Sequence, residues 1–515
     1  MPSALEYDRD DDRPQLAPPT TAEWVVLAVA LVAGLVLRFA TTSALWLDEA
    51  LSVNIAALPL GEITDALRQD GHPPLYYGLL HGWMQVFGDG DVAVRALSGV
   101  FSVLTLVVVW ELARRRGGVA VAAGSMLVLT LLPYATRYAT EARMYSLVTL
   151  LVAIGWWALD QAFERPDTRW PAVVVGVAAA GLLYSHYWSL WPLGATGCLM
   201  LVVWWRSDDE RRRVGRRCAV ALLAGAVAFV PWLPVLADQL ARTGTPWAAG
   251  TRPTAALALA VSDLAGTPVM VDALLGAMAL VVLVLLGLFA VPQPPWGVRL
   301  DLRTVPGVRL ELGVVVAALA VGIAVAWAMD TAFASRYIAF VVPVVAVAAG
   351  RGLAVLPAPT PRLVAGVGTA VLLGAVSVVG VVDQRTQAES AAEAVTATSA
   401  DLVVLCPDQL GPAFSRVADP DLRIITVPEL TAPERVDWRD YEERNRGADA
   451  VAVAEQILEQ REGGSIWIVW KDGYQTYEGL CESVRNHLVA ALGGTTVLDA
   501  DAARYFEPMR VERAG

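Results

Sequence analysis

Long apolar runs constrain this chain more than any other feature of its sequence. A helix needs about 20 mostly apolar residues to cross a bilayer. Eleven runs approach that length, at residues 24–40, 96–113, 119–135, 144–160, 170–186, 189–205, 218–237, 271–291, 312–329, 337–356 and 363–382. Of the 515 residues, 56% are hydrophobic and 17% are charged, which excludes an ordinary soluble globular protein. The sequence therefore predicts a polytopic α-helical membrane protein with eleven spans.

The connections between these runs differ in arginine content. One set, together with the N-terminal tail, carries 18 Arg, whereas the other set is longer in total and carries seven. Connections rich in Arg stay in the cytoplasm. We therefore expect a multi-pass protein of the cytoplasmic membrane, with a cytoplasmic tail over 1–23 and a transmembrane domain over 24–383. Everything that follows the eleventh run is expected outside the cytoplasm.

The first external connection, residues 41–94, is long and is not disordered in composition. Segments 60–70 and 73–88 have the patterns of short helices. Pro73 and Pro74 suit a first helical turn, and the apolar, aromatic face of 73–88 suits a membrane–water interface. We expect two interfacial helices that fold over the outer end of the bundle.

The C-terminal segment, residues 384–515, has a different pattern. Strands are predicted at 401–406, 423–427, 465–470 and 495–500, and amphipathic helices at 448–462 and 477–493. This alternation predicts an extracytoplasmic α/β domain with a largely parallel sheet. Cys406 and Cys481 could pair if the segment lies outside the cytosol. The segment lacks a glycine fingerprint for nucleotide binding, and the chain lacks a basic tract that would suggest binding to nucleic acid.

Two adjacent acids, Asp48 and Glu49, stand in "ALWLDEALSV" just outside the first run. A solvated helix end is the plainer interpretation. Against it, the flanking residues are apolar and an ordered loop follows that could bury both acids. Neighbouring helical residues point about 100° apart. One acid can therefore face a cavity while the other orients it or pairs with an Arg.

The motif "DGHPPLYY" places His72 before two prolines, which hold its backbone extended and present its ring. The plainer interpretation is a loop that starts a helix. Tyr76 either stacks on a sugar or anchors the interface.

Three further motifs carry costly polar groups at a membrane surface. In "TRYATEARMYS", Arg137 and Glu141 are spaced i,i+4 and predict a pair. Arg143 has no such partner in sequence, and Arg336 raises the same question at the start of "SRYIAFVVP". His186, in "YSHYWS", is more often a structural group than a ligand. Together, acids, arginines and histidines beside apolar helices fit a lipid that carries a phosphate, with a carboxylate to deprotonate an acceptor hydroxyl.

The order of these motifs resembles a known family. "LWLDEA", "GHPPLYY", "RALSGVFSVLTL", "EARMYS", "YSHYWS" and "SRYIAFVVP", within about residues 24–350, are similar to the GT-C superfamily of integral-membrane glycosyltransferases. The similar branch contains protein O-mannosyltransferases and the lipid A aminoarabinose transferase, a branch like glycosyltransferase family 39. The chain lacks room for the β-trefoil domain of eukaryotic O-mannosyltransferases.

The resemblance implies an inverting glycosyltransferase that uses a polyprenyl-phosphate sugar, with mannose or arabinose as the expected sugar. Its acceptor would be an envelope glycan, lipid or protein at the outer face of the membrane. The Arg-rich, Lys-poor usage suits an actinobacterial source. The resemblance implies a catalytic role for two acids: Asp48 as the general base or as a carboxylate that orients the acceptor, and Glu49 as a support for the first loop or the acceptor. It also implies Arg143, Arg336 and Arg137 at the donor phosphate, and His72, Tyr76, Glu141 and His186 at the sugar or acceptor. Some relatives use a divalent metal, for which Asp48 and His72 would be ligands here.

Two rival functions remain open from the sequence. A lipid or glycan transporter or flippase would also be polytopic, but it predicts polar sites at mid-depth and paired helix breaks. A non-catalytic scaffold that binds envelope polymers would tolerate the loss of Asp48.

Overall fold

The computed structural model describes residues 16–245, 248, 250–266, 271–302, 306–398 and 401–515. Most of the predicted cytoplasmic tail lies outside these residues. The chain divides into two compact units that are each discontinuous in sequence. Unit 1 holds residues 1–40, 95–231 and 250–381, and unit 2 holds residues 41–94, 232–249 and 382–515.

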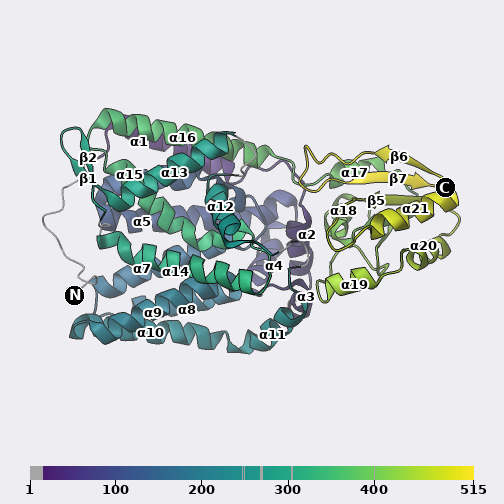
Figure 1. Cartoon of the computed structure of the whole chain (residues 1–515), viewed down its shortest axis with the longest axis horizontal. Coiled ribbons are helices and arrows are strands. Elements are labelled where there is room, and N and C mark those ends of the chain that lie inside the picture. Colours follow the sequence, from purple (N-terminus) through teal and green to yellow (C-terminus); the bar gives the residue numbers. More distant parts are fainter. Residues whose placement is uncertain (1–15, 246–247, 249, 267–270, 303–305, 399–400) are drawn as a thin grey trace. The chain divides into compact units, whose positions relative to one another are not determined.

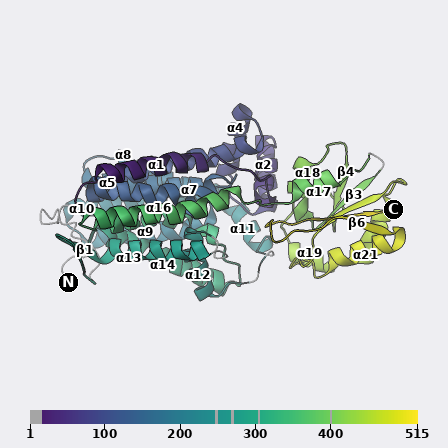
Figure 2. The same cartoon turned by 90° about the horizontal axis from the view of Figure 1, so that it is seen from above.

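Unit 1 is a bundle of long helices (Figures 1 and 2). Its α-helices are α1 (Thr21–Leu37), α5 (Asp91–Leu131), α6 (Pro133–Ala139), α7 (Tyr145–Glu164), α8 (Trp170–Ser185), α9 (Leu190–Arg206), α10 (Asp209–Ala228), α12 (Pro253–Leu264), α13 (Val271–Phe289), α14 (Pro306–Ala328), α15 (Val342–Ala354) and α16 (Pro359–Val382). The unit also has three short 3₁₀ helices. Helix η1 (Tyr187–Ser189) comes directly before α9, η2 (Val230–Trp232) follows α10, and η3 (Ser335–Val341) comes directly before α15. A hairpin of β1 (Ala290–Gln293) and β2 (Gly297–Leu300) links α13 to α14.

Seven helical segments of the described chain are long and apolar enough to cross a membrane. Four more apolar helices are shorter: α1, the apolar part of α8, α12 and the apolar part of α13. The chain is thus a multi-pass membrane-type helical protein, and the count of eleven spans stays a prediction.

The breaks between helices follow local chemistry. Two predicted spans, 96–113 and 119–135, form the two parts of α5, which meet at a kink where Gly118 has φ 75°. A positive φ is costly for residues with a Cβ, so glycine suits this kink. The polar "YSHYWS" separates α8 from α9, as the sequence predicts. Helix α12 lies between the apolar runs at 218–237 and 271–291, where the sequence predicts no helix.

Close helix packing in unit 1 depends on small residues. A Cβ added to Gly124 would lie 2.5 Å from the carbonyl oxygen of Gly350, and one added to Gly350 would lie 2.2 Å from the Ser125 nitrogen. Small residues let membrane helices approach closely. This contact fixes α15 against α5, and α15 directly continues η3, which carries Arg336.

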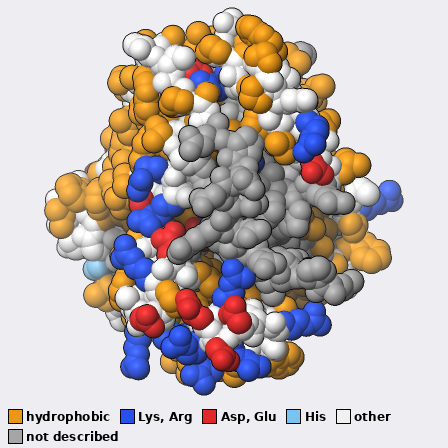
Figure 3. Space-filling view, turned by 90° about the vertical axis from the view of Figure 1, so that its left-hand side faces the viewer, with side chains coloured by type: hydrophobic (Ala, Val, Ile, Leu, Met, Phe, Trp, Pro, Cys, Tyr) orange, Lys and Arg blue, Asp and Glu red, His pale blue; other side chains and the backbone are white. Residues whose placement is uncertain are grey.

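Charged side chains gather on the face of the molecule seen in Figure 3, among hydrophobic ones. Within unit 1, ion pairs join Arg115 to Glu164 and Arg116 to both Asp160 and Glu311. They therefore tie α5 to α7 and α14.

Unit 2 combines the first long connection with the C-terminal segment. Its α-helices are α2 (Leu47–Ala56), α3 (Leu60–Asp70), α4 (Leu75–Phe87), α11 (Leu233–Arg242), α17 (Ala388–Ala394), α18 (Gly411–Val417), α19 (Tyr441–Gly447), α20 (Ala450–Glu459) and α21 (Leu480–Leu492). Its strands are β3 (Leu402–Cys406), β4 (Arg423–Thr426), β5 (Ile466–Trp470), β6 (Gly494–Leu498) and β7 (Arg510–Ala514), and η4 covers Asp408–Leu410.

The five strands form one sheet in the order β4-β3-β5-β7-β6. Strand β3 is parallel to both β4 and β5, whereas β7 is antiparallel to β5 and to β6. The four strands predicted from the sequence are confirmed within a few residues, and β7 was missed. The predicted helices at 448–462 and 477–493 correspond to α20 and α21.

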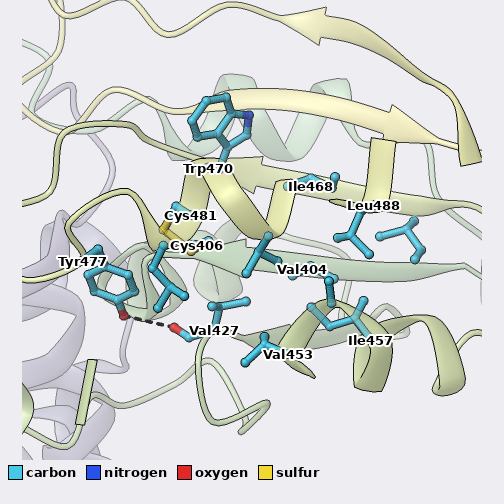
Figure 4. Close-up of a cluster of buried hydrophobic side chains, with 14 of the residues drawn as sticks. Val404, Cys406, Val427, Val453, Ile457, Ile468, Trp470, Tyr477, Cys481 and Leu488 are labelled. Atoms are coloured by element: carbon cyan, nitrogen blue, oxygen red, sulfur yellow. Dashed lines mark hydrogen bonds between the residues drawn. A yellow bond between two sulfur atoms is a disulfide. The ribbon is translucent and has the colours of Figure 1, made fainter. Parts of the chain in front are cut away.

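Apolar side chains cover both faces of this sheet. Figure 4 shows one face, where Val404, Ile468 and Trp470 from the strands meet Ile457 and Leu488 from α20 and α21. Cys406 and Cys481 are joined by a disulfide that ties β3 to α21. A bond of this kind is typical of proteins outside the cytosol.

The first long connection is hydrogen-bonded to the C-terminal segment within unit 2. The Trp438 N–H donates to the Gln69 carbonyl at 3.0 Å, and the Asn54 amide donates to the Glu434 carbonyl at 2.7 Å. The middle segment of the unit, residues 232–249, is joined to the same connection, because the Gln239 side chain donates to the Leu67 carbonyl at 2.7 Å. The helices predicted at 60–70 and 73–88 are confirmed as α3 and α4. Their placement over the bundle stays a prediction.

Candidate active site

The acid pair lies in the first turn of α2, and its two members have different surroundings. Asp48 is partly exposed, whereas Glu49 is fully buried. Glu49 pairs with Arg385, whose Nη1 lies 3.3 Å from Oε2 of Glu49 and whose backbone N–H donates to the Ser43 hydroxyl. The sequence left open that one of the two acids pairs with an arginine, and in the structure that acid is Glu49. Asp48 is the more exposed of the two acids.

A third carboxyl group, Glu507, stands beside Asp48. The Leu47 N–H and the Thr386 hydroxyl donate hydrogen bonds to Glu507. Burial raises the pKa of Glu507 to about 8, and the neighbouring Asp48 raises it further while Lys471 opposes the rise. Glu507 is therefore mostly protonated at neutral pH.

His72 and Tyr77 share a carboxylate that sequence reasoning did not select. Nδ1 of His72 lies 2.9 Å from Oδ2 of Asp70, and the Tyr77 hydroxyl donates to the same oxygen at 2.8 Å. Tyr76 is fully buried and packs edge-on against Tyr77, with ring centroids 6.3 Å apart. This burial favours a packing role for Tyr76 over stacking on a sugar. Asp70 fixes the orientation of the His72 ring.

A divalent metal has limited support from the side chains of the described chain. Across those residues, no group of three or more His, Cys, Asp or Glu side chains is arranged to hold a metal ion. His72 is paired with Asp70, which was not one of the ligands expected from the sequence. Two protein ligands fall short of the set of carboxylates and histidines that binds a divalent ion tightly. We therefore assign no step to a metal.

At the end of β3, Asp408 forms a buried hydrogen-bond cluster with two tyrosines. The Tyr441 hydroxyl donates to Asp408, and the Tyr477 hydroxyl lies 2.8 Å from the same carboxylate. The Tyr477 hydroxyl also lies 3.0 Å from the Val427 carbonyl, a contact drawn in Figure 4. Burial raises the pKa of Asp408 to about 6, although both hydroxyls favour its ionised form.

We expect Asp408→Asn to remove a pH dependence from the stability of the sheet. A carboxyl group whose pKa is higher in the folded state stabilises that state at low pH. This contribution is lost as the pH rises from about 4 through about 6. The loss is at most about 3 kcal/mol for a shift of about two units. Hydrogen–deuterium exchange of β3 and β5 at pH 5 and pH 8, corrected for intrinsic rates, measures it. Asp421→Asn, at an exposed turn, is the control and should keep the wild-type difference between the two pH values.

Arginines of unit 1 lie around the short helix α6. Arg137 and Glu141 approach to 3.8 Å, so the predicted i,i+4 pair is present, at the end of α6. Glu141 and Arg143 are almost fully buried, and the Ser98 hydroxyl donates to the Arg143 carbonyl at 3.0 Å. The segment between α6 and α7 is thus held rigidly with its charges inside the protein.

A row of aromatic rings continues from this segment. Successive ring centroids lie 4.4 Å apart for Tyr134 and Tyr138, 4.8 Å for Tyr138 and Tyr145, 5.7 Å for Tyr145 and His186, and 5.2 Å for His186 and Tyr337. The Trp188 N–H donates to Nδ1 of His186 at 3.2 Å. His186 thus has a structural role as a cap of η1, while its ring also belongs to this row.

Arg336 lies in η3, next to the last ring of the row. The Tyr134 hydroxyl donates to the Arg336 carbonyl at 2.7 Å. The preceding residue, Ser335, donates its hydroxyl to the Asp263 carboxylate on α12 at 2.6 Å. These bonds hold η3 between α6 and α12 and leave the Arg336 side chain partly exposed.

An apolar cavity of about 400 Å³ lies within the same unit. Its walls come from α7, α8, α9, α10, α14 and the η3–α15 segment. The lining includes Leu182, one helical turn before His186, and Phe340, four residues after Arg336. Arg116, Asp160 and Glu311 also line it. The cavity wall therefore includes residues four positions away from two candidate site residues and offers hydrocarbon surface.

The candidate residues fall into two sets. Unit 2 holds Asp48, Glu49, His72 and Tyr76, and unit 1 holds Arg137, Glu141, Arg143, His186 and Arg336. Sequence reasoning missed Asp70, Asp263, Arg385, Lys471 and Glu507. Asp70 was available from its position two residues before His72, but Glu507 and Arg385 give no local signal.

Solved structures share this architecture. The ArnT protein of Cupriavidus metallidurans bound to undecaprenyl phosphate matches 96% of this chain and 98% of its own, with 15% identity and a TM-score of 0.57. The Archaeoglobus fulgidus oligosaccharyltransferase AglB, in complex with an inhibitory peptide and a dolichol-phosphate, matches 92% of this chain and 72% of its own, with 10% identity and a TM-score of 0.51. The arabinofuranosyltransferase AftD from Mycobacteria matches 98% of this chain and 40% of its own, with 15% identity and a TM-score of 0.51. The chain therefore has the fold of the GT-C glycosyltransferase superfamily.

A family model also matches part of the chain. Residues 71–237 match the Dolichyl-phosphate-mannose-protein mannosyltransferase family. A comparison with curated protein sequences gives no match. The resemblance seen in the sequence motifs is confirmed by the family match and by the fold.

Proposed function

We propose that this protein is a glycosyltransferase that moves one sugar from a polyprenyl-phosphate donor to a cell-envelope acceptor at the outer face of the cytoplasmic membrane. The observation that carries the proposal is in unit 1, where Arg143 and Arg336 stand around a row of aromatic rings beside an apolar cavity. This combination of cations, rings and hydrocarbon surface matches a phosphate, a sugar and a prenyl chain. ArnT and AglB, which share the fold, were solved with lipid phosphates bound.

On the donor side, Arg143 and Arg336 would bind the phosphate and the cavity would take the first part of the prenyl chain. Arginine binds phosphate oxygens through charge-assisted hydrogen bonds in a planar fork. The bond from the anomeric carbon to the phosphate oxygen breaks, and its electron pair stays on the phosphate. Arginines placed there stabilise the negative charge that grows in the transition state.

On the acceptor side, Asp48 would act as the general base. The acceptor hydroxyl attacks the anomeric carbon from the face opposite the phosphate, and its proton passes to the Asp48 carboxylate. This displacement inverts the anomeric configuration. Glu49 is engaged by Arg385 and fully buried, so its role is to hold α2 in place.

The direct test supplies purified protein with radiolabelled polyprenyl-phosphate mannose and, separately, polyprenyl-phosphate arabinose. A cell-envelope fraction of the source organism serves as the acceptor. Transfer of label from lipid to envelope material, with release of polyprenyl phosphate, is the expected result. Movement of the intact lipid across a vesicle bilayer without transfer would favour a flippase and contradict the proposal.

We expect Arg336→Gln to weaken the binding of undecaprenyl phosphate by about tenfold or more. A hydrogen bond to a charged group contributes about 1.5–3 kcal/mol. Arg336→Lys keeps the charge but loses the planar fork, so its affinity should lie between those of the wild type and Arg336→Gln. Native mass spectrometry over a range of lipid concentrations measures the affinity. Arg114→Gln is the matched control, because Arg114 is an exposed partner of Glu111 in the same unit. Equal affinities for the Arg336 and Arg114 variants would remove Arg336 from the phosphate site.

A further inference from the structure

The sheet of unit 2 has a switch point at the centre of its parallel part. From β3 the chain goes to β4 on one side and then crosses to β5 on the other side of β3. In sheets of this kind, ligands bind outside the carboxyl ends of the strands where the order reverses. Here that edge lies beyond Cys406 and Trp470, the last residues of β3 and β5.

Residues with reactive or polar side chains follow both strands at this edge. Asp408 comes two residues after β3, and Lys471 comes directly after β5. Lys471 is the only lysine of the chain. Its backbone N–H donates to the Cys406 carbonyl at 3.0 Å, and its ammonium lies 5.4 Å from the centre of the Tyr474 ring. An ammonium group and an aromatic ring are therefore fixed together at the switch point.

Helix α2 brings the acid pair to the same edge. Trp46 and Leu47 belong to the hydrophobic cluster that includes Cys406, Trp470 and Tyr477, and α2 packs against α18. Trp46 also meets Phe506 edge-on at 5.5 Å. The loop before β7 is thereby held against the start of α2.

Glu507 links the sheet edge to Asp48. Its backbone pairs with the segment that enters the domain, because the Glu507 N–H donates to the Arg385 carbonyl at 2.9 Å. The side chain interacts electrostatically with both Asp48 and Lys471, and Tyr474 interacts with Asp48 and Glu507. Glu507 is buried, with only 8% of its surface exposed, yet one of its oxygens, Oε2, has no hydrogen-bond partner. A buried polar atom without a partner indicates a site for a missing hydrogen-bond partner.

We propose that the carboxyl edge of the C-terminal sheet is the acceptor site of this enzyme, in which Lys471, Glu507 and Tyr474 hold a carbohydrate acceptor with one hydroxyl at Asp48. This inference rests on the proposed function. It gives the C-terminal segment, whose role the fold alone leaves open, a specific task in recognition of the acceptor.

A carbohydrate fits these groups better than a peptide does. Sugar hydroxyls both donate and accept hydrogen bonds, so they can pair with Oε2 of Glu507 in either protonation state and accept from the three N–H groups of Lys471. The apolar face of a sugar ring can lie on the Tyr474 ring. An extended peptide would instead seek the unpaired edge of a sheet, which is provided here by β4 and β6.

The test measures the dependence of sugar transfer on acceptor and on donor separately. Full-length Lys471→Gln and Glu507→Gln variants receive radiolabelled polyprenyl-phosphate sugar and increasing amounts of the cell-envelope fraction. We expect the amount of envelope fraction at half-maximal transfer to rise about tenfold for Lys471→Gln, the effect of losing one good hydrogen bond to a charged group, and by a smaller factor for Glu507→Gln, whose carboxyl group is mostly neutral. The donor KM and the affinity for undecaprenyl phosphate should stay within about twofold of the wild-type values, and Lys471→Arg should restore most of the acceptor dependence.

Arg423→Gln and Glu462→Gln are the matched controls. Arg423 and Glu462 form an ion pair, and Arg423 begins β4, so the pair lies at the opposite edge of the same sheet. Unchanged acceptor dependence in the Lys471 and Glu507 variants, or an equal loss in the controls, would overturn the acceptor site while leaving the proposed function intact. Label recovered on protein rather than on glycan would overturn the carbohydrate assignment. If the wild-type protein transferred neither sugar, both the proposed function and this inference would fall.

Discussion

Asp48→Asn should lower the rate of sugar transfer by about a thousandfold, which lies within the range that general acid–base catalysis contributes. An amide cannot accept the proton of the acceptor hydroxyl, so the variant loses the base without a change in side-chain size. Because the arginines proposed to bind the phosphate belong to the other unit of the chain, affinity for undecaprenyl phosphate should stay within about twofold. Single-turnover transfer from a radiolabelled donor measures the first quantity, and native mass spectrometry measures the second.

Asp65→Asn is the matched control for this substitution. Asp65 lies on α3 in the same long connection, is largely exposed and approaches Arg68 to 3.5 Å. Transfer by this control should match the wild type. Normal transfer by Asp48→Asn would exclude Asp48 as the base and would favour the scaffold interpretation.

Arg385→Gln should destabilise unit 2 by about 3–5 kcal/mol, because it leaves the Glu49 carboxylate buried without its cation. The two side chains are 5% and 0% exposed, so water cannot replace the lost partner. Thermal unfolding and limited proteolysis of the full-length protein report the loss. The double variant Arg385→Gln with Glu49→Gln should recover part of it, since neither charge then stays buried.

An exposed ion pair in the same unit provides the comparison. Arg446 and Glu442 are 55% and 50% exposed, so Arg446→Gln should cost less than about 1 kcal/mol. If both substitutions cost the same, burial of the Glu49–Arg385 pair would have no energetic consequence. The proposed role of Glu49 as a support for α2 would then fail.

Hydropathy predicted most helices of unit 1 because a span needs a long apolar run. It missed α12, whose 12 residues fall below that length. Strand β7 was missed for a different reason. Charged residues such as Glu512 and Arg513 are typical of solvent-facing positions. Glu512 is nevertheless almost fully buried and accepts a hydrogen bond from Arg485 at 2.7 Å. A buried charge with a distant partner cannot be recognised from local sequence.

The candidate site shows the same division between local and distant information. Asp48, His72 and Arg143 were found because each stands in a short, unusual motif. The Arg385 that pairs with Glu49 is 336 positions away, and Glu507 lies in a loop with no pattern of its own. The disulfide between Cys406 and Cys481 was one of several outcomes open from the sequence, and only the fold brings the two sulfurs together.

The discontinuity of unit 2 has a consequence for biogenesis. Its three segments come from the beginning, the middle and the end of the chain. During synthesis, Asp48 leaves the ribosome long before Arg385, Lys471 and Glu507 exist. The surroundings of the acid pair are therefore completed only when the last strand, β7, has been made. A prematurely terminated chain that ends before residue 507 would carry every motif of the membrane region and still lack the proposed acceptor side.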